Sequence, residues 1–117
     1  DANYPFVRFA EPQNLPDAIR AAVTATLARD YESAIDAWET AATTADQLID
    51  AGRPELALGV HLALGRLYAR LTAPLHDTER ARHHYTQAYE IATAASLEIP
   101  RSIRSEIAAS GAMAHAQ

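Results

Sequence analysis

The chain contains no cysteine and no lysine among its 117 residues, and it has only four glycines. Without cysteine it forms no disulfide and offers neither a thiolate nucleophile nor a cysteine-bound zinc site. The ten basic residues, all arginine, are outnumbered by fifteen acidic ones, for a formal net charge of −5. Nucleic-acid-binding proteins carry a basic patch or stripe, so this charge balance argues against that class. No apolar run free of charges reaches the ~18 residues of a membrane-spanning helix, so no transmembrane segment is expected.

The patterns of common catalytic and metal sites are also missing. The glycines stand apart instead of forming a phosphate-cradling loop, and no strand–turn–helix segment is present to hold a nucleophilic serine. Glu79 and His83 lie one helical turn apart with His84 beside them, but two ligands on a charged helix face are too few for a zinc site. We therefore expect these three side chains to be solvated and His61 to be a packed, neutral histidine. The sequence predicts no enzyme, no metal and no cofactor.

Alanine, in contrast, is abundant, with 27 copies, while strand-favouring runs are absent. This composition favours close-packed helices, because alanine costs least in a helix and lets backbones approach. The most apolar stretch, residues 54–71, has apolar side chains at helical spacing on two opposite sides, and only a narrow stripe with Arg66 and Arg70 is polar. A helix that is apolar nearly all round must be covered nearly all round, so this segment is expected at the centre of an all-α fold.

Four further helices are predicted around the central one. The first begins near Asn14 and the second runs without interruption over residues 31–50, followed by Gly52 as a stop signal. The second helix has a predicted buried stripe of Tyr31, Ile35, Trp38, Ala42, Ala45 and Ile49. Asp77 or Thr78 caps a helix that reaches about Leu97, and Pro100 starts a last helix over residues 101–110.

Short links between long helices force antiparallel neighbours. The sequence therefore predicts two antiparallel helical hairpins, residues 15–50 and 54–97, with residues 101–110 as a C-terminal capping helix. Together they make one helical domain of residues 15–110, with a flexible tail over residues 111–117.

Residues 1–14 differ from the rest of the chain and predict an extended N-terminal arm. They contain two prolines and three aromatic residues, Tyr4, Phe6 and Phe9. An arm this rich in large apolar side chains is expected to dock, either on its own domain or on another subunit. The sequence begins at Asp1 without methionine, which fits both a removed leader and a trimmed chain, so export and a cytoplasmic location both stay open.

The two predicted hairpins resemble tetratricopeptide repeats, helical pairs of about 34 residues with large and small residues at fixed places. Residues 28–42, ARDYESAIDAWETAA, resemble the turn and second helix of a repeat. The matching residues are Tyr31, Ala34, Trp38 and Ala41 in the first hairpin, and Leu64, Gly65, Tyr68, Ala81, Tyr85 and Ala88 in the second. Ala34 and Ala81 are 47 positions apart instead of ~34, so the resemblance is to a divergent array with the right-handed stacking of that family.

The resemblance implies a non-catalytic module that binds a protein partner through the first helix of each hairpin. The partner-binding residues on that surface are expected to be Ile19, Val23, Leu27, Leu62, Arg66, Ala69 and Arg70, with Tyr4, Phe6 and Phe9 added by the arm. Arg66 and Arg70 lie one turn apart and either capture a partner carboxylate or pair with acidic residues of flanking helices, such as Asp36 or Glu90.

Two other functions stay open at this point. The chain can be an accessory or structural subunit of a larger, exported or periplasmic complex, anchored by its arm. It can also be a helical bundle that binds a small ligand in a pocket lined by alanines and tyrosines. We interpret Trp38 and the helical tyrosines as core residues and not as the lining of a ligand pocket, because they recur at helical spacing.

Overall fold

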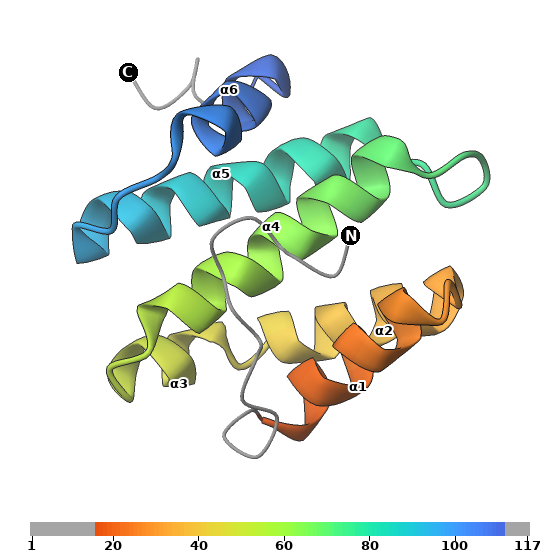
Figure 1. The fold of residues 1–117 in the computed structure, drawn as a ribbon, viewed down its shortest axis with the longest axis horizontal. Helices are drawn as coiled ribbons and strands as arrows, with labels where there is room; N and C mark the ends of the chain where they lie inside the picture. The colour runs from red at the N-terminus through yellow and green to blue at the C-terminus, as the bar shows by residue number, and fades with distance from the viewer. Residues whose placement is uncertain (1–15, 112–117) are drawn as a thin grey trace.

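The computed structural model describes residues 16–111, and this part of the chain contains six α-helices and no strand (Figure 1). The helices are α1 (Asp17–Leu27), α2 (Tyr31–Ala42), α3 (Ala45–Asp50), α4 (Pro54–Arg70), α5 (Thr78–Ala95) and α6 (Arg101–Ala109). The all-α class predicted from the sequence is confirmed. The predicted arm with Tyr4, Phe6 and Phe9, and the predicted tail after Gly111, lie outside the described residues.

Helix α4 lies at the centre of the fold, as its apolar pattern predicts (Figure 1). It packs most extensively against α5 and also contacts α2 and α3, while α1 packs on α2 and α6 on α5. Its buried residues are Leu56, Ala57, Leu58, Gly59, Val60, His61, Leu62, Ala63, Leu64, Gly65, Leu67 and Tyr68. We call α1 with α2 the first helical pair and α4 with α5 the second helical pair. The handedness of the stack and its register as a repeat stay predictions.

Local signals in the sequence place most helix ends correctly. Gly52 has a φ of 80° directly after α3, a left-handed conformation that glycine adopts without steric cost. Pro54 is the first residue of α4, and the Asp77 side chain accepts the backbone N–H of Arg80 at 3.0 Å to cap α5. Helix α1 starts at Asp17 with Pro16 before it, so it begins later than predicted, and Asn14 lies outside the described residues.

The single helix predicted over residues 31–50 is wrong, because the chain breaks at Thr43–Thr44 into α2 and α3. Both threonine hydroxyls donate to backbone carbonyls three residues earlier, Thr43 to Thr40 at 2.6 Å and Thr44 to Ala41 at 2.9 Å. Such bonds offer the backbone an alternative to the regular helical ladder. The end of the predicted stripe is also wrong, since Leu48 is buried and Ile49 is 37% exposed.

Each helical pair buries one of the aromatic side chains of the sequence pattern. In the first pair Trp38 is completely buried, as predicted, and its indole Nε1 donates to the hydroxyl of Thr26 at 3.0 Å. In the second pair Tyr85 covers Gly65 so closely that a Cβ added there would lie 3.0 Å from two ring carbons. The glycine therefore lets α4 and α5 approach with the tyrosine ring between them.

Candidate functional site

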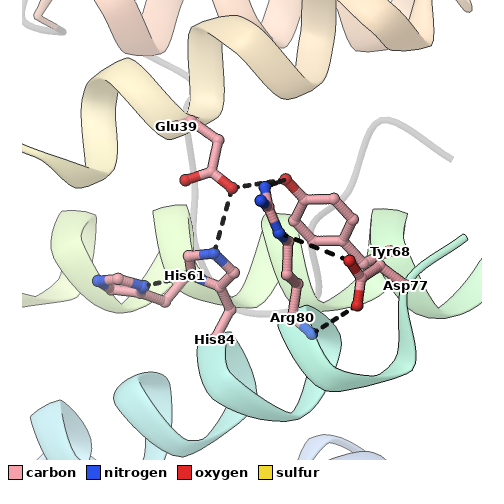
Figure 2. Close-up of polar contacts among 6 residues, drawn as sticks. All are labelled: Glu39, His61, Tyr68, Asp77, Arg80 and His84. Carbon is pink, nitrogen blue, oxygen red and sulfur yellow. Dashed lines mark hydrogen bonds and ion pairs between the residues drawn. The ribbon is translucent and has the colours of Figure 1, made fainter. Parts of the chain in front are cut away.

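Polar side chains, from buried histidines to an exposed arginine, join the two helical pairs at the junction of α2, α4 and α5 (Figure 2). Helix α2 contributes a carboxylate, α4 a histidine and a tyrosine, and the start of α5 a second histidine, an arginine and its capping aspartate. We call this set the Glu39 network; it consists of Glu39, His61, Tyr68, Asp77, Arg80 and His84.

The carboxylate of Glu39 is the common acceptor of the network. The Tyr68 hydroxyl donates to its Oε2 at 2.6 Å, and Nε2 of His84 lies 3.4 Å from the same oxygen. Arg80 in turn donates to the Tyr68 hydroxyl at 3.4 Å, next to its own contact with Asp77. Figure 2 shows Tyr68 of α4 and His84 of α5 meeting at Glu39, the one side chain supplied by α2. Glu39 thereby ties the first helical pair to the second.

The two histidines form a direct pair between α4 and α5. Their Nδ1 atoms are 3.0 Å apart, and the stacked rings have centroids 5.2 Å apart at 28°. A carboxylate only accepts hydrogen bonds, so the His84 proton lies on Nε2 toward Glu39, which leaves Nδ1 of His84 as an acceptor. Nδ1 of His61 must then be the donor of the bond between the rings. With this assignment of donors and acceptors, the position of Glu39 defines the tautomers of both rings.

Burial favours the neutral form of both histidines in this network. Burial lowers the pKa of His61 to about 4, with the nearby His84 and His83 adding to the effect, so the prediction of a packed neutral His61 is confirmed. Burial also lowers the pKa of His84, although Glu39 partly opposes it. The prediction that His84 is solvated is wrong, since only 5% of it is exposed.

A second carboxylate, Glu106 of α6, binds the arginines of the central helix. Nε and Nη2 of Arg66 each donate to one carboxylate oxygen at 2.7 Å, the Tyr85 hydroxyl also donates, and Arg70 lies 3.5 Å away. We call Arg66, Arg70, Tyr85 and Glu106 the Glu106 clamp. Burial raises the pKa of Glu106, but the hydrogen bonds from Arg66 and Tyr85 outweigh it and leave the pKa below its usual value.

The Glu106 clamp shows which acidic residue pairs with the two arginines, and it reduces the predicted partner-binding arginines from two to one. Neither Asp36 nor Glu90 is the partner of Arg66 or Arg70, because the acidic residue comes from α6, 40 positions beyond Arg66. The Arg66 side chain is only 14% exposed and fully engaged, whereas that of Arg70 is 67% exposed and contacts Glu106 at longer range. Of these two arginines, Arg70 is therefore the one whose side chain is open to a partner.

The other predicted partner-binding residues separate into buried and exposed ones. Ile19 and Leu62 are buried at 0% and 1% exposure, so they belong to the core and present no surface to a partner. Val23 is half-buried, Ala69 is exposed, and Leu27 is 58% exposed. The structure therefore does not bring the predicted residues together as one surface.

The outer face of α1 carries a shallow, largely apolar depression of about 560 Å³. Its lining residues are Asp17, Arg20, Ala21, Thr24, Ala25, Ala28 and Asp30. Leu27 lies three residues after Thr24 and seven after Arg20, so helical spacing puts it at the edge of this depression. We call the depression with Leu27 the α1 face.

The sequence held signals for some of the residues that it did not predict. His84 lies three residues after Ala81 and four before Ala88, on the same helical stripe. Its burial could therefore have been predicted from the sequence. Glu106 lies three residues after the buried Ile103, at the edge of the packed face of α6. The meeting of Glu39, His61 and His84 depends on how three helices pack, which no local pattern encodes.

Neither network is arranged as a metal site, since residues 16–111 contain no group of three or more His, Cys, Asp or Glu side chains able to hold an ion. Among the helices of this range, none has the length and apolarity to cross a bilayer. The chain matches no protein-family model, no curated protein and no solved structure.

Proposed function

We propose that this chain is a non-catalytic protein–protein interaction module, related in architecture to divergent tetratricopeptide repeats. The observation that supports the proposal most strongly is the α1 face, where Leu27 is 58% exposed beside a depression lined by three alanines. Leu27 is the most exposed of the large hydrophobic residues in the described part of the chain. A protein segment that covers its exposed part would gain about 1–2 kcal/mol from that side chain alone.

The depression fits an apolar polypeptide segment better than a charged one. Alanine side chains leave the floor low, so that a partner's larger apolar side chains can approach the α1 backbone. Asp17 and Asp30 flank the floor with negative charge, while Arg20 forms an ion pair with Asp17. An apolar helix or strand with polar flanks is therefore the expected partner.

The polar clusters support a binding role over a catalytic one. In the Glu39 network the carboxylate, the tyrosine hydroxyl and the histidines bind one another, and in the Glu106 clamp both carboxylate oxygens are taken by donors. General acid–base catalysis needs such a group within hydrogen-bond reach of a substrate atom. In both clusters these groups hydrogen-bond to one another, so their role is to hold the helices together.

One observation bears on the alternative of a small-ligand-binding bundle. A pocket of about 280 Å³ lies at the corner between α5 and α6 and includes Tyr89, Leu97 and Arg104. Sites for small molecules usually measure about 300–1,000 Å³, so this pocket lies just below the usual range. The other alternative is an accessory subunit anchored through Tyr4, Phe6 and Phe9. These residues lie outside the described part of the chain, so we place this function after the interaction module.

A site-specific crosslinking experiment tests the proposal. A photoreactive amino acid is placed at position 27 of the full chain, and at position 49 as a matched control, because Ile49 is the other large hydrophobic residue with notable exposure, at 37%. After irradiation in extract from the source cells, crosslinked polypeptides are identified by mass spectrometry, and the affinity of the purified partner is measured by titration. We expect one dominant partner polypeptide from position 27 and none from position 49.

Matched substitutions then connect the crosslink to the surface. Leu27→Asp should weaken binding of that partner at least tenfold with an unchanged melting temperature, whereas Ile49→Asp should leave the affinity within about twofold. Equal crosslinking at both positions, or full affinity of Leu27→Asp, would remove the α1 face from the binding site.

A further inference from the structure

The histidine pair has a proton requirement that follows from its geometry alone. Two ring nitrogens 3.0 Å apart attract each other only if one carries a proton and the other a lone pair. Since Glu39 keeps the His84 proton on Nε2, the pair at neutral pH has two ring protons, one directed at Glu39 and one between the rings. Nε2 of His61 has no hydrogen-bond partner among residues 16–111, so it can accept a third proton.

A fourth proton cannot be accommodated. It would have to reside on Nδ1 of His84, where it would face the N–H of His61 across the same 3.0 Å. Two donors at that distance repel each other and leave both without an acceptor in a buried place, which costs free energy. The contact between α4 and α5 is thus compatible with two or three ring protons and incompatible with four.

The groups around the histidine pair compensate only part of the positive charge that a third or fourth ring proton adds. Helix α2 supplies one negative group, Glu39, which already accepts from Tyr68 of α4. Helix α5 supplies positive and protonatable groups instead, namely Arg80 near Tyr68 and His83, whose ring meets that of His84 edge-on at 5.1 Å. Asp77 pairs with Arg80 at the outer end. One carboxylate therefore faces up to two imidazolium charges and an arginine.

We propose that the His61–His84 pair, oriented by Glu39, is a proton-sensitive lock that holds α4 to α5 and the second helical pair to the first. The lock is closed while at least one of the facing Nδ1 atoms is unprotonated. It opens when both rings become imidazolium ions, so that mild acid loosens the junction at which α2, α4 and α5 meet. This inference goes beyond the proposed binding function and does not rest on it.

Proton linkage gives the direction and size of the effect. Because the closed form lowers the pKa of the histidines, opening takes up protons and becomes more favourable as the pH falls below the ordinary histidine pKa of about 6.5. A shift of the His61 pKa from 6.5 to about 4 raises the equilibrium constant for opening about 30-fold between pH 7.5 and pH 5.0. His84 adds to this factor.

The first test observes the two rings in the whole protein by ¹⁵N–¹H NMR of the imidazoles. At pH 7.5 we expect a proton on Nδ1 of His61 and one on Nε2 of His84, with His61 titrating at about pH 4 and His84 below its ordinary pKa. If both rings carry their proton on Nε2, or titrate near pH 6.5 like free histidine, the lock does not exist.

The second test measures the unfolding equilibrium by denaturant titration at pH 7.5 and pH 5.0. Trp38, the only tryptophan of the chain, is the fluorescence reporter, and circular dichroism follows the helices. We expect the unfolding constant to rise at least 30-fold in the unmodified chain and in the control His76→Gln, which removes an exposed histidine. His61→Leu/His84→Leu should reduce the rise to about threefold or less. An unchanged rise in the double variant would contradict the proposal, and if that variant does not fold, the imidazole NMR of the unmodified chain decides alone.

Discussion

The two helical pairs of this fold are held together in different ways. In the first pair, α1 has an outer face open to solvent, and its contact with α2 centres on Trp38 with one hydrogen bond to Thr26. In the second pair, α4 is covered on nearly all sides, and polar networks join it to α2, α5 and α6. The first pair therefore leaves one helix face open beside a buried apolar core, whereas the second pair adds hydrogen-bonded networks to its apolar core.

This difference assigns distinct roles to the two pairs. A helix with one covered face retains a surface for a partner, which is what α1 provides. The second pair has aligned donors and acceptors at fixed positions, and such groups favour one packing over others because each unmatched buried donor costs about 1–3 kcal/mol. The first pair is thus suited to binding and the second to specifying the fold.

The largest expected effect comes from Trp38→Ala. Removal of a buried tryptophan side chain typically costs ~3–5 kcal/mol, out of the ~5–15 kcal/mol that stabilises a domain. Since Trp38 is completely buried at the centre of the first pair, we expect this variant to be unfolded or close to it at room temperature by circular dichroism. Trp38→Phe serves as a graded control, with an intermediate loss. A melting temperature of Trp38→Ala within a few degrees of the unmodified chain would mean that the first pair does not depend on this residue.

The parts of the fold that depend on neighbouring residues were predictable from the sequence. Gly52, Pro54, Asp77 and Pro100 mark helix ends because each acts on the backbone within a few residues. The central helix was predictable for the same reason, since a period of 3.6 residues shows its two apolar sides.

The interruption between α2 and α3 and the two networks were missed for different physical reasons. At Thr43 and Thr44 the competition between hydroxyl and amide donors for backbone carbonyls is decided by a small free-energy difference that periodicity does not report. Arg66 and Glu106 are 40 positions apart and meet only through the packing of α6, so the sequence did not identify Glu106 as the acidic partner of the arginines. Long-range pairing of this kind needs the three-dimensional fold.

Arg66→Ala should have the next largest effect and tests whether the second pair depends on the Glu106 clamp. Hydrogen bonds to charged groups contribute about 1.5–3 kcal/mol, so loss of the paired bonds to Glu106 should cost about 2–3 kcal/mol. Arg70→Ala is the matched control one turn away, and exposed ion pairs contribute only about 0.2–1 kcal/mol. Denaturant titrations of both variants should separate them by about 1–2 kcal/mol. Equal stability of the two variants would mean that the clamp does not hold α6. In a separate binding titration, a loss of partner affinity in Arg70→Ala alone would assign this arginine to binding.

The smallest effect, and the sharpest in its sign, is expected for Gly65→Ala. In an ordinary helix this change stabilises by about 1 kcal/mol, because alanine has the higher helix propensity. Here the new Cβ would lie 3.0–3.1 Å from ring carbons of Tyr85, whose hydroxyl is held by Glu106 and whose ring is 2% exposed. Overpacking of a filled core costs about 1–3 kcal/mol, so the net change should be a loss of about 1 kcal/mol, or roughly 4–8 °C in melting temperature.

A double-mutant cycle checks the cause of that loss. In a Tyr85→Leu background the ring is gone, so Gly65→Ala should become neutral or stabilising, although Tyr85→Leu itself lowers stability. The sign change between the two backgrounds is the readout, measured as the difference in unfolding free energy within each pair of variants. If Gly65→Ala stabilises the unmodified chain, α4 and α5 do not approach as closely as described. The contrast between a closely fitted second pair and a first pair with an open helix face then loses its structural basis.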